Sequence, residues 1–170
     1  MTSPSRDPAF RTEVGLEDGK AVAELVEATG FFNPAEVAIA AELVEARLAA
    51  GDASGYFFVL ADEAGGAQSP SRLLGYTCYG PIDGSEGSFD LYWIAIHPDR
   101  QGHGLGRVLM QQAEERIAAM GGRRVYVETS GRAQYEPTRA FYSRLGYVCE
   151  ARLRDFYGTG DDKLFFVKAL

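Results

Sequence analysis

A glycine-rich turn between a strongly apolar segment and an amphipathic one constrains the fold of this chain most. Phe89–Ile96 is the most apolar strand-like run of the sequence, and Gln101–Gly106 follows it with glycine at every second position. The next residues have helical periodicity, with Leu105, Leu109, Ala113, Ile117 and Met120 on the apolar face and Gln111, Gln112, Glu114 and Glu115 facing out. The pattern predicts a strand, a tight turn and a helix.

A turn of this kind is suited to an anion. Glycine has no Cβ, so the backbone can curl tightly and come close to a ligand. The N–H groups at the start of the following helix, together with the helix dipole, attract negative charge. A pyrophosphate group fits this description, although such a turn also occurs without any ligand.

Two other nucleotide-binding motifs fit the segment poorly. A Walker motif requires Gly-Lys-Ser or Gly-Lys-Thr, and neither follows the turn. The dinucleotide-binding fingerprint places an acidic residue about 20 residues further on, where Glu128 stands. However, Arg107 occupies the position of its third glycine, and the turn lies too late in the chain for a second nucleotide-binding half.

The remaining elements are read from periodicity and from turn residues. Asn33-Pro34-Ala35-Glu36 predicts a capped helix start, and Val37, Ala41, Val44 and Leu48 are expected on one face of that helix. Glu63–Arg72 reads as a loop, and Asp161-Asp162 as a hairpin turn. The other predicted strands and helices are strand Phe10–Val14, helix Asp18–Ala28, strand Tyr56–Ala61, strand Leu73–Tyr79, strand Val125–Thr129, helix Pro137–Leu145, and strands Val148–Phe156 and Leu164–Ala169. The order predicts a mixed α/β or α+β fold in one domain, residues 1–170 with a core from about residue 10.

Charge and composition argue against several classes of protein. A net charge of -7 disfavours nucleic acid as the main partner. No apolar run approaches the roughly 20 residues that span a bilayer, and Met1–Pro8 lacks the features of a secretory signal, so a cytoplasmic location is expected. Cys78 and Cys149 lie in apolar segments and are predicted to be buried thiols, with no metal site.

Two motifs resemble those of a known superfamily. Gln101-Gly102-His103-Gly104-Leu105-Gly106 resembles the acetyl-CoA signature Arg/Gln-x-x-Gly-x-Gly/Ala of the GNAT N-acetyltransferases. Thr138–Tyr147 resembles the family block Phe-Tyr-x-x-x-Gly-Phe/Tyr, and the resemblance covers roughly Leu73–Ala169. Gln134 and Tyr135 stand where many members carry an asparagine.

The resemblance implies a central, mostly antiparallel sheet flanked by helices, with a splay between two parallel strands where acetyl-CoA lies. It implies that the backbone of the strand end binds the pantetheine arm and that the glycine turn binds the pyrophosphate, with Arg107 or Arg144 reaching the outer phosphates. The implied cofactor-binding residues are Ile94, Ala95, Ile96, Gln101, Gly102, His103, Gly104, Leu105, Gly106 and Arg107.

Three side chains are candidates for catalysis. The resemblance implies that Tyr142 protonates the leaving thiolate, although a tyrosine there could also be a packing residue. An alkylammonium with a pKa near 10 must lose a proton before it attacks a thioester. Asp90 and Glu128 are candidate bases, and Tyr92 is an alternative that would hold a water molecule. His97 and His103 are expected to be loop residues.

The implied activity is acetyl transfer from acetyl-CoA to a primary amine of a small molecule or peptide, without metal, and with a homodimer as one option. A small cationic amine is favoured because acidic residues recur near the expected acceptor side: Asp83, Glu86, Asp90, Glu128 and Asp155. Two alternatives are a non-catalytic acyl-CoA-binding regulator of the same fold and a nucleotide-binding oxidoreductase.

Overall fold

The computed structural model describes residues 7–64 and 72–170, and the chain forms two compact units. Unit 1 consists of Met1–Tyr79 and Trp93–Ala113, and unit 2 consists of Gly80–Tyr92 and Glu114–Leu170. Two strands, β3 and β4, and one helix, α3, contribute residues to both units. Each unit has its own layers and packing.

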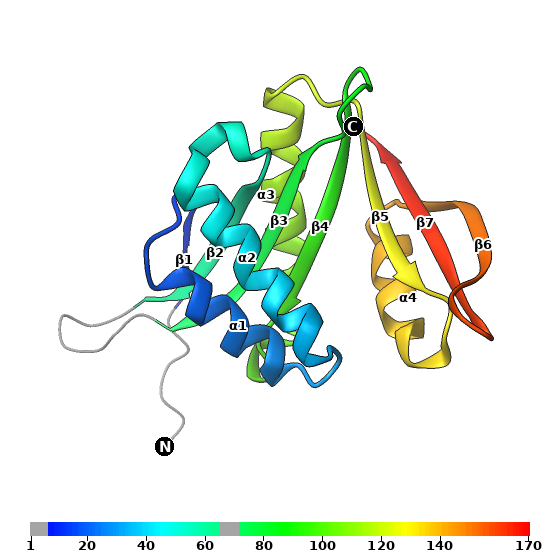
Figure 1. Cartoon of the computed structure of the whole chain (residues 1–170), viewed down its shortest axis with the longest axis horizontal. Coiled ribbons are helices and arrows are strands. Elements are labelled where there is room, and N and C mark those ends of the chain that lie inside the picture. Colours follow the sequence, from blue (N-terminus) through cyan, green and yellow to red (C-terminus); the bar gives the residue numbers. More distant parts are fainter. Residues whose placement is uncertain (1–6, 65–71) are drawn as a thin grey trace. The chain divides into compact units, whose positions relative to one another are not determined.

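The elements follow the predicted order closely (Figure 1). They are β1 Pro8–Arg11, α1 Asp18–Ala28, α2 Pro34–Ala50, β2 Phe57–Glu63, β3 Leu73–Pro81, β4 Ser88–Ile96, α3 Leu105–Ala119, β5 Arg124–Ser130, α4 Glu136–Arg144, β6 Val148–Gly158 and β7 Asp161–Ala169. Short 3-10 turns lie at Gly51–Ser54, Pro98–Arg100 and Ala133–Tyr135. Among the described residues, no helix has the length and apolarity needed to cross a membrane.

The strands follow the order β1-β2-β3-β4-β5-β7-β6. In unit 1, β1 pairs with β2 and β2 with β3, both antiparallel. In unit 2, β5 pairs antiparallel with β7, and β7 with β6. The start of β4 runs parallel to β5, from Ser88 opposite Arg124 to Asp90 opposite Tyr126. The mixed sheet with a parallel pair and flanking helices is therefore confirmed.

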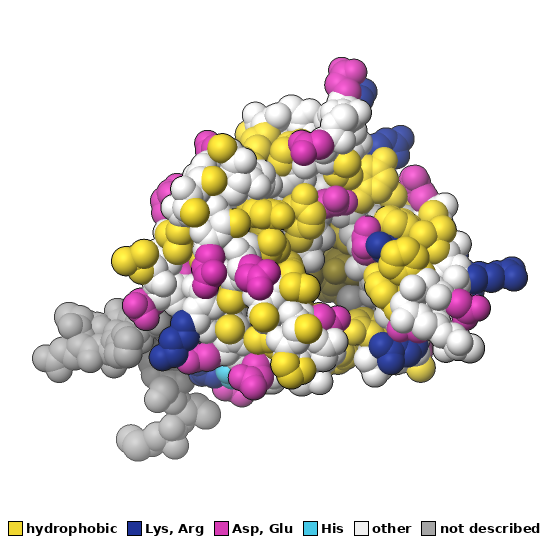
Figure 2. All heavy atoms as spheres, viewed as in Figure 1, with side chains coloured by type: hydrophobic (Ala, Val, Ile, Leu, Met, Phe, Trp, Pro, Cys, Tyr) yellow, Lys and Arg dark blue, Asp and Glu magenta, His cyan; other side chains and the backbone are white. Residues whose placement is uncertain are grey.

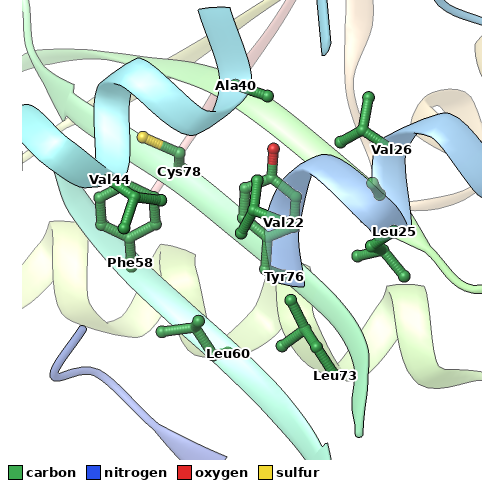
Figure 3. Packing of buried hydrophobic residues seen from close by; sticks show 11 residues of the cluster. Val22, Leu25, Val26, Ala40, Val44, Phe58, Leu60, Leu73, Tyr76 and Cys78 are labelled. Atoms are coloured by element: carbon green, nitrogen blue, oxygen red, sulfur yellow. The ribbon is translucent and has the colours of Figure 1, made fainter. Parts of the chain in front are cut away.

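In unit 1, α1 and α2 cover one face of β2 and β3 (Figure 1). Their apolar side chains meet those of the strands in one cluster, which includes Val22, Val26, Val44, Phe58, Leu60, Tyr76 and Cys78 (Figure 3). α3 contacts the other face, where Gly75 of β3 lets Leu109 approach closely. A Cβ at Gly75 would lie 3.0 Å from Cδ1 of Leu109, closer than packed carbon atoms normally come.

The capping box at the start of α2 is confirmed. The Asn33 side chain accepts from the Glu36 N–H, and the Glu36 carboxylate accepts from the Asn33 N–H at 2.8 Å. The expected apolar face is only partly right, because Ala40 rather than Ala41 is fully buried and Leu48 is 38% exposed. Small alanine side chains are frequent along α2, so periodicity alone does not fix which of them faces the core.

In unit 2, the two faces of β5 and β7 differ in character. Phe166 of β7 is buried and packs against Tyr142 of α4, and Val127 lies opposite Phe166 on the same face. Because strand residues alternate between faces, Glu128 and Phe165, which lie opposite each other, belong to the other face. Figure 1 shows α4 behind β5 and β7.

Three sequence-based predictions in unit 2 are wrong. Asp161 and Asp162 are buried and begin β7 instead of forming the hairpin turn, because their carboxylates bind Arg132 and Arg152. Cys149 is exposed, since β6 is exposed along its whole length. Glu114 was expected to face solvent but is half-buried, where it accepts from Tyr147 and pairs with Lys168. Periodicity does not reveal such tertiary partners.

Candidate functional site

In unit 1, two glycines in the left-handed backbone region shape the turn between β4 and α3. Gly102 has a φ of 76° and Gly104 has a φ of 84°, and this region costs a residue with a Cβ about 1–2 kcal/mol. A Cβ built at either glycine meets no atom of residues 7–64 and 72–170 within 4 Å, apart from its own chain neighbours. Packing within the chain therefore does not require glycine here. The backbone conformation does, and the space beside the turn is open.

The polar side chains of the turn bind the turn itself. Gln101 Nε2 donates to the Ile96 carbonyl at 3.1 Å, which ties the turn to the end of β4. A ring nitrogen of His103 lies 2.8 Å from the Gln101 carbonyl oxygen. His97 contacts the guanidinium of Arg72, and partial burial together with this charge lowers the pKa of His97. Both histidines are thus engaged in loop contacts.

The start of α3 offers backbone donors next to the turn. Val108 N donates to Gly104 O at 3.2 Å, so the N–H groups of Leu105, Gly106 and Arg107 precede the first helical donor and have no acceptor within the helix. Leu105 is buried and fixes the helix, whereas Arg107 is exposed. Exposed glycines, N–H groups without an acceptor in the helix, and a guanidinium form a donor set that fits the pyrophosphate of acetyl-CoA.

The end of β4 is fixed against β3 within unit 1. His97 N donates to the Leu74 carbonyl at 2.8 Å, and Ala95 is buried in the core cluster. Ile94 and Ile96 are half-buried, and Cδ1 of Ile96 lies 2.9 Å from the position that a Cβ of Gly75 would take. The predicted pantetheine-binding strand Ile94–Ile96 is therefore a rigid, well-packed segment.

In unit 2, the two candidate bases lie on one face of the strands. Asp90 of β4 is opposite Tyr126 of β5, and Glu128 is two residues beyond Tyr126, so the three side chains share a face. Burial and, to a lesser extent, repulsion from Glu128 raise the pKa of Asp90, while the nearby ammonium of Lys163 partly offsets this rise. The strand register therefore places the two carboxylates on the same face of unit 2.

Lys163 of β7 belongs to the same group of side chains and was not predicted from the sequence. Its Nζ lies 2.5 Å from a carboxylate oxygen of Glu128, and its side chain is only 13% exposed. The same Nζ lies 4.3 Å from the ring centre of Phe156 and 5.2 Å from that of Phe165. The alternation of β7 places Lys163 and Phe165 on one face, but it gives no sign of the Glu128 partner.

Tyr142 lies on the other face of unit 2. It is 5% exposed on α4, with ring centres of Phe141, Tyr147 and Phe166 within 6.0 Å of its own. Burial raises the pKa of the Tyr142 phenol, which therefore stays protonated at working pH. Because strand residues alternate between faces, Tyr142 packs on the face of β7 that carries Phe166, and Glu128 points from the other face of β5.

The other predicted acidic residues do not join Asp90 and Glu128 in one group. The Asp155 carboxylate accepts from Gly160 N at 2.6 Å and shapes the β6–β7 turn. Asp83 and Glu86 are exposed in the β3–β4 loop. Gln134 and Tyr135, at the position of the family asparagine, lie in the 3-10 turn before α4.

Comparison with known proteins defines the class. The model of the acetyltransferase (GNAT) family matches residues 22–147. The chain therefore belongs to the acetyltransferase (GNAT) family. The mycothiol acetyltransferase of Rhodococcus jostii (strain RHA1) is 33% identical over 148 residues, which are 83% of this chain and 46% of that protein. The chain spans about half the length of the curated relatives it matches.

Solved structures share the fold over nearly the whole chain. A Desulfovibrio desulfuricans protein placed in the GNAT family is 44% identical, with a TM-score of 0.89, over 95% of this chain and 98% of that one. The Salmonella typhimurium protein yncA, solved with its cofactor acetyl-CoA, has a TM-score of 0.72 at 19% identity, over 96% of this chain and 94% of its own. The second likeness concerns the fold alone.

Proposed function

We propose that the chain moves an acetyl group from acetyl-CoA to the primary amine of a small cationic molecule or peptide. The observation that carries the proposal is the group of side chains on the open face of unit 2. There, Glu128 and aromatic rings surround the alkylammonium of Lys163, with Asp90 electrostatically coupled to both charged groups. These side chains form an environment that stabilises an alkylammonium, the charged form of the proposed acceptor.

The cofactor side of the proposal rests on the turn and on the end of β4. The backbone of Gln101–Arg107 binds the pyrophosphate, and Arg107 or Arg144, both exposed, binds the outer phosphates. Ile94–Ile96 binds the pantetheine arm as an added strand would, and one of its N–H groups polarises the acetyl carbonyl. Bound acetyl-CoA supplies the reactive thioester. Family membership supports these assignments.

The acceptor side of the proposal requires a base. The pKa of Asp90 is raised by burial, and a raised pKa makes its carboxylate a stronger base for an ammonium proton. Glu128 orients the ammonium. One proton passes from the ammonium to Asp90 and then to solvent, and the amine nitrogen bonds to the acetyl carbon. The carbon–sulfur bond then breaks, and the proton that the nitrogen loses in forming the amide balances, through solvent, the protonation of the departing thiolate to a thiol.

Tyr142 completes the proposal by donating to the departing thiolate. Burial raises the pKa of Tyr142, so the phenol is available as a donor, but full proton transfer to a thiolate, whose thiol has an ordinary pKa near 8.5, is uphill. An apolar environment also destabilises the thiolate and so raises the pKa of its thiol. The difference between that pKa and the pKa of Tyr142 is therefore smaller than in water. The phenol therefore acts first as a hydrogen-bond donor to the developing charge.

The test is a screen for acetyl-CoA-dependent thiol release with four matched groups of acceptors. These are polyamines, amino-sugar antibiotics, free amino acids and peptides with free N-termini. We expect turnover with cationic amines, and a loss of turnover in both Asp90→Asn and Glu128→Gln. Acetyl-CoA binding without thiol release in any group would instead indicate a non-catalytic regulator. Preferred turnover of an uncharged amine by both variants would contradict the assigned acceptor site.

A further inference from the structure

The side chain of Lys163 lies where an ammonium ligand is expected to bind. Its Nζ forms an ion pair of 2.5 Å with Glu128 and faces the rings of Phe156 and Phe165, with that of Tyr157 at 5.9 Å. Carboxylates and aromatic faces are the groups by which proteins recognise alkylammonium ions. Figure 2 shows hydrophobic side chains gathered over β6 and β7, with basic and acidic side chains beside them.

The surroundings of Lys163 differ from those of a second paired lysine on the same strand. Lys168 Nζ pairs with Glu114 at 2.6 Å and lies 5.6 Å from the Tyr147 ring centre. Lys168 is opposite Val125 on the helix-covered face, where Tyr147 also donates to Glu114. Two partners therefore bind Glu114 within the fold, so this pair is explained by packing.

The Lys163 pair is not enclosed in this way. Glu128 is 41% exposed, and the exposed fractions of Phe156 and Tyr157 are 53% and 50%. The lysine head is shielded, yet three of the groups that contact it are open to solvent. A small cation from solvent can therefore reach the same carboxylate and rings once the flexible lysine side chain rotates away.

We propose that Lys163 is an internal competitor for the acceptor site: its ammonium occupies the position of the substrate ammonium and must be displaced before the amine can bind. This inference rests on the proposed function. When the binding-competent state is only partly populated, the apparent affinity falls by that fraction. Lys163 would therefore weaken the binding of every cationic acceptor and would exclude amines that compete poorly for Glu128.

The kinetic test compares Lys163→Met with Lys168→Met, using the best acceptor found for the wild type. Methionine replaces lysine with an unbranched side chain of similar shape that carries no charge. We expect Lys163→Met to lower the KM for the amine about threefold or more without changing the KM for acetyl-CoA, whereas Lys168→Met keeps the amine KM of the wild type. An unchanged or higher amine KM in Lys163→Met would overturn the proposal, because Lys163 would then be a residue that positions Glu128.

A second measurement needs no catalysis. Lysine labelling with an acetylating reagent, read by mass spectrometry, is carried out in tetramethylammonium chloride and in sodium chloride of equal concentration. Tetramethylammonium has no N–H group, so the reagent does not consume it. We expect the quaternary ion to expel Lys163 and to increase its labelling severalfold, with no change at Lys168. Equal labelling of Lys163 in both salts would contradict displacement.

The two tests separate the two proposals. If the wild type acetylates no amine but tetramethylammonium exposes Lys163, then the site binds cations and the proposed function fails. If the wild type acetylates amines but Lys163→Met leaves the amine KM unchanged, then the function stands and the competitor role fails.

Discussion

At the scale of single residues, position in the fold decides which side chains are available for chemistry. Asp90 and Glu128 look like ordinary strand charges in the sequence, yet β4 and β5 place them on one face of unit 2. Tyr142 lies on the opposite, helix-covered face, among aromatic rings. The proposed base, Asp90, therefore lies near charged groups, whereas the proposed donor to the thiolate, Tyr142, is buried among apolar rings. These two environments shift the pKa values of the two groups for different reasons.

The Tyr142→Phe variant tests the donor role. It keeps the ring that packs on Phe166 and removes only the hydroxyl, so we expect turnover to fall about a hundredfold while the KM for acetyl-CoA stays the same. Tyr147→Phe is the matched control, because it also loses one hydroxyl from the same aromatic group, one that binds Glu114. Wild-type turnover of Tyr142→Phe, measured where chemistry limits the rate, would show that Tyr142 only packs.

The pKa of Asp90 predicts a pH dependence. Burial and Glu128 raise it, Lys163 lowers it, and Tyr126 is the titratable group directly opposite. The acid limb of kcat/KM should therefore lie above the range of an ordinary aspartate, and Asp90→Asn should lower kcat/KM on the alkaline side of that limb. An acid limb at the ordinary aspartate pKa would argue against Asp90 as the base.

The same shift has a consequence for stability. The folded state binds the Asp90 proton more tightly than the unfolded state, so the contribution of Asp90 is most favourable below its unfolded pKa. It is lost as pH rises through the folded pKa. Asp90→Asn should therefore raise the melting temperature at pH 8 more than at pH 3. A larger increase in melting temperature at pH 3 than at pH 8 would contradict the raised pKa of Asp90.

At the scale of elements, local signals and tertiary packing determine different features. The helix Asp18–Ala28 and the capping box of α2 agree with prediction because both depend on neighbouring residues. The start of β7 at Asp161 was missed because its two aspartates are buried and pair with arginines outside the strand, Arg132 and Arg152. The glycine turn belongs to the first group, since its conformation is local and, within the part of the chain that the structure describes, no packing contact occupies the Cβ position of Gly102 or Gly104.

The turn can be tested with a pair of matched glycines. Gly104 and Gly84 have φ values of 84° and 77°, and neither has an atom within 4 Å of its Cβ position. Valine at either position should therefore strain the backbone to a similar degree. We expect only Gly104→Val to lose the thermal stabilisation that acetyl-CoA gives, because its side chain also blocks the approach of phosphate. Equal stabilisation of both variants by acetyl-CoA would remove the turn from the cofactor site.

At the scale of the whole molecule, charge favours one kind of acceptor. The net charge is -7, and Figure 2 shows acidic side chains spread over the visible face. A negative surface speeds the capture of cations, and salt weakens this effect as the screening length shortens. A cytoplasmic location and the oligomeric state stay predictions from the sequence.

The charge argument predicts a salt dependence. Between about 0.05 M and 0.5 M sodium chloride, kcat/KM for a cationic amine should fall severalfold, because screening reduces its attraction. An arylamine that is neutral at the assay pH serves as the control and should change little. A similar response of both acceptors would show that surface charge does not select the substrate.

The sequence by itself determined the element order, the mixed α/β class, the glycine turn and the family resemblance. These features depend on periodicity, caps and turns, which short stretches of chain encode. Only the tertiary structure placed Asp90, Glu128 and Lys163 on one face of unit 2, half-buried Glu114 and exposed Cys149. Those outcomes depend on which strands are neighbours and on their register, and pairs such as Glu128 and Lys163 are 35 positions apart in the numbered chain. Contacts across such separations leave no local periodicity, so they were decided by the fold.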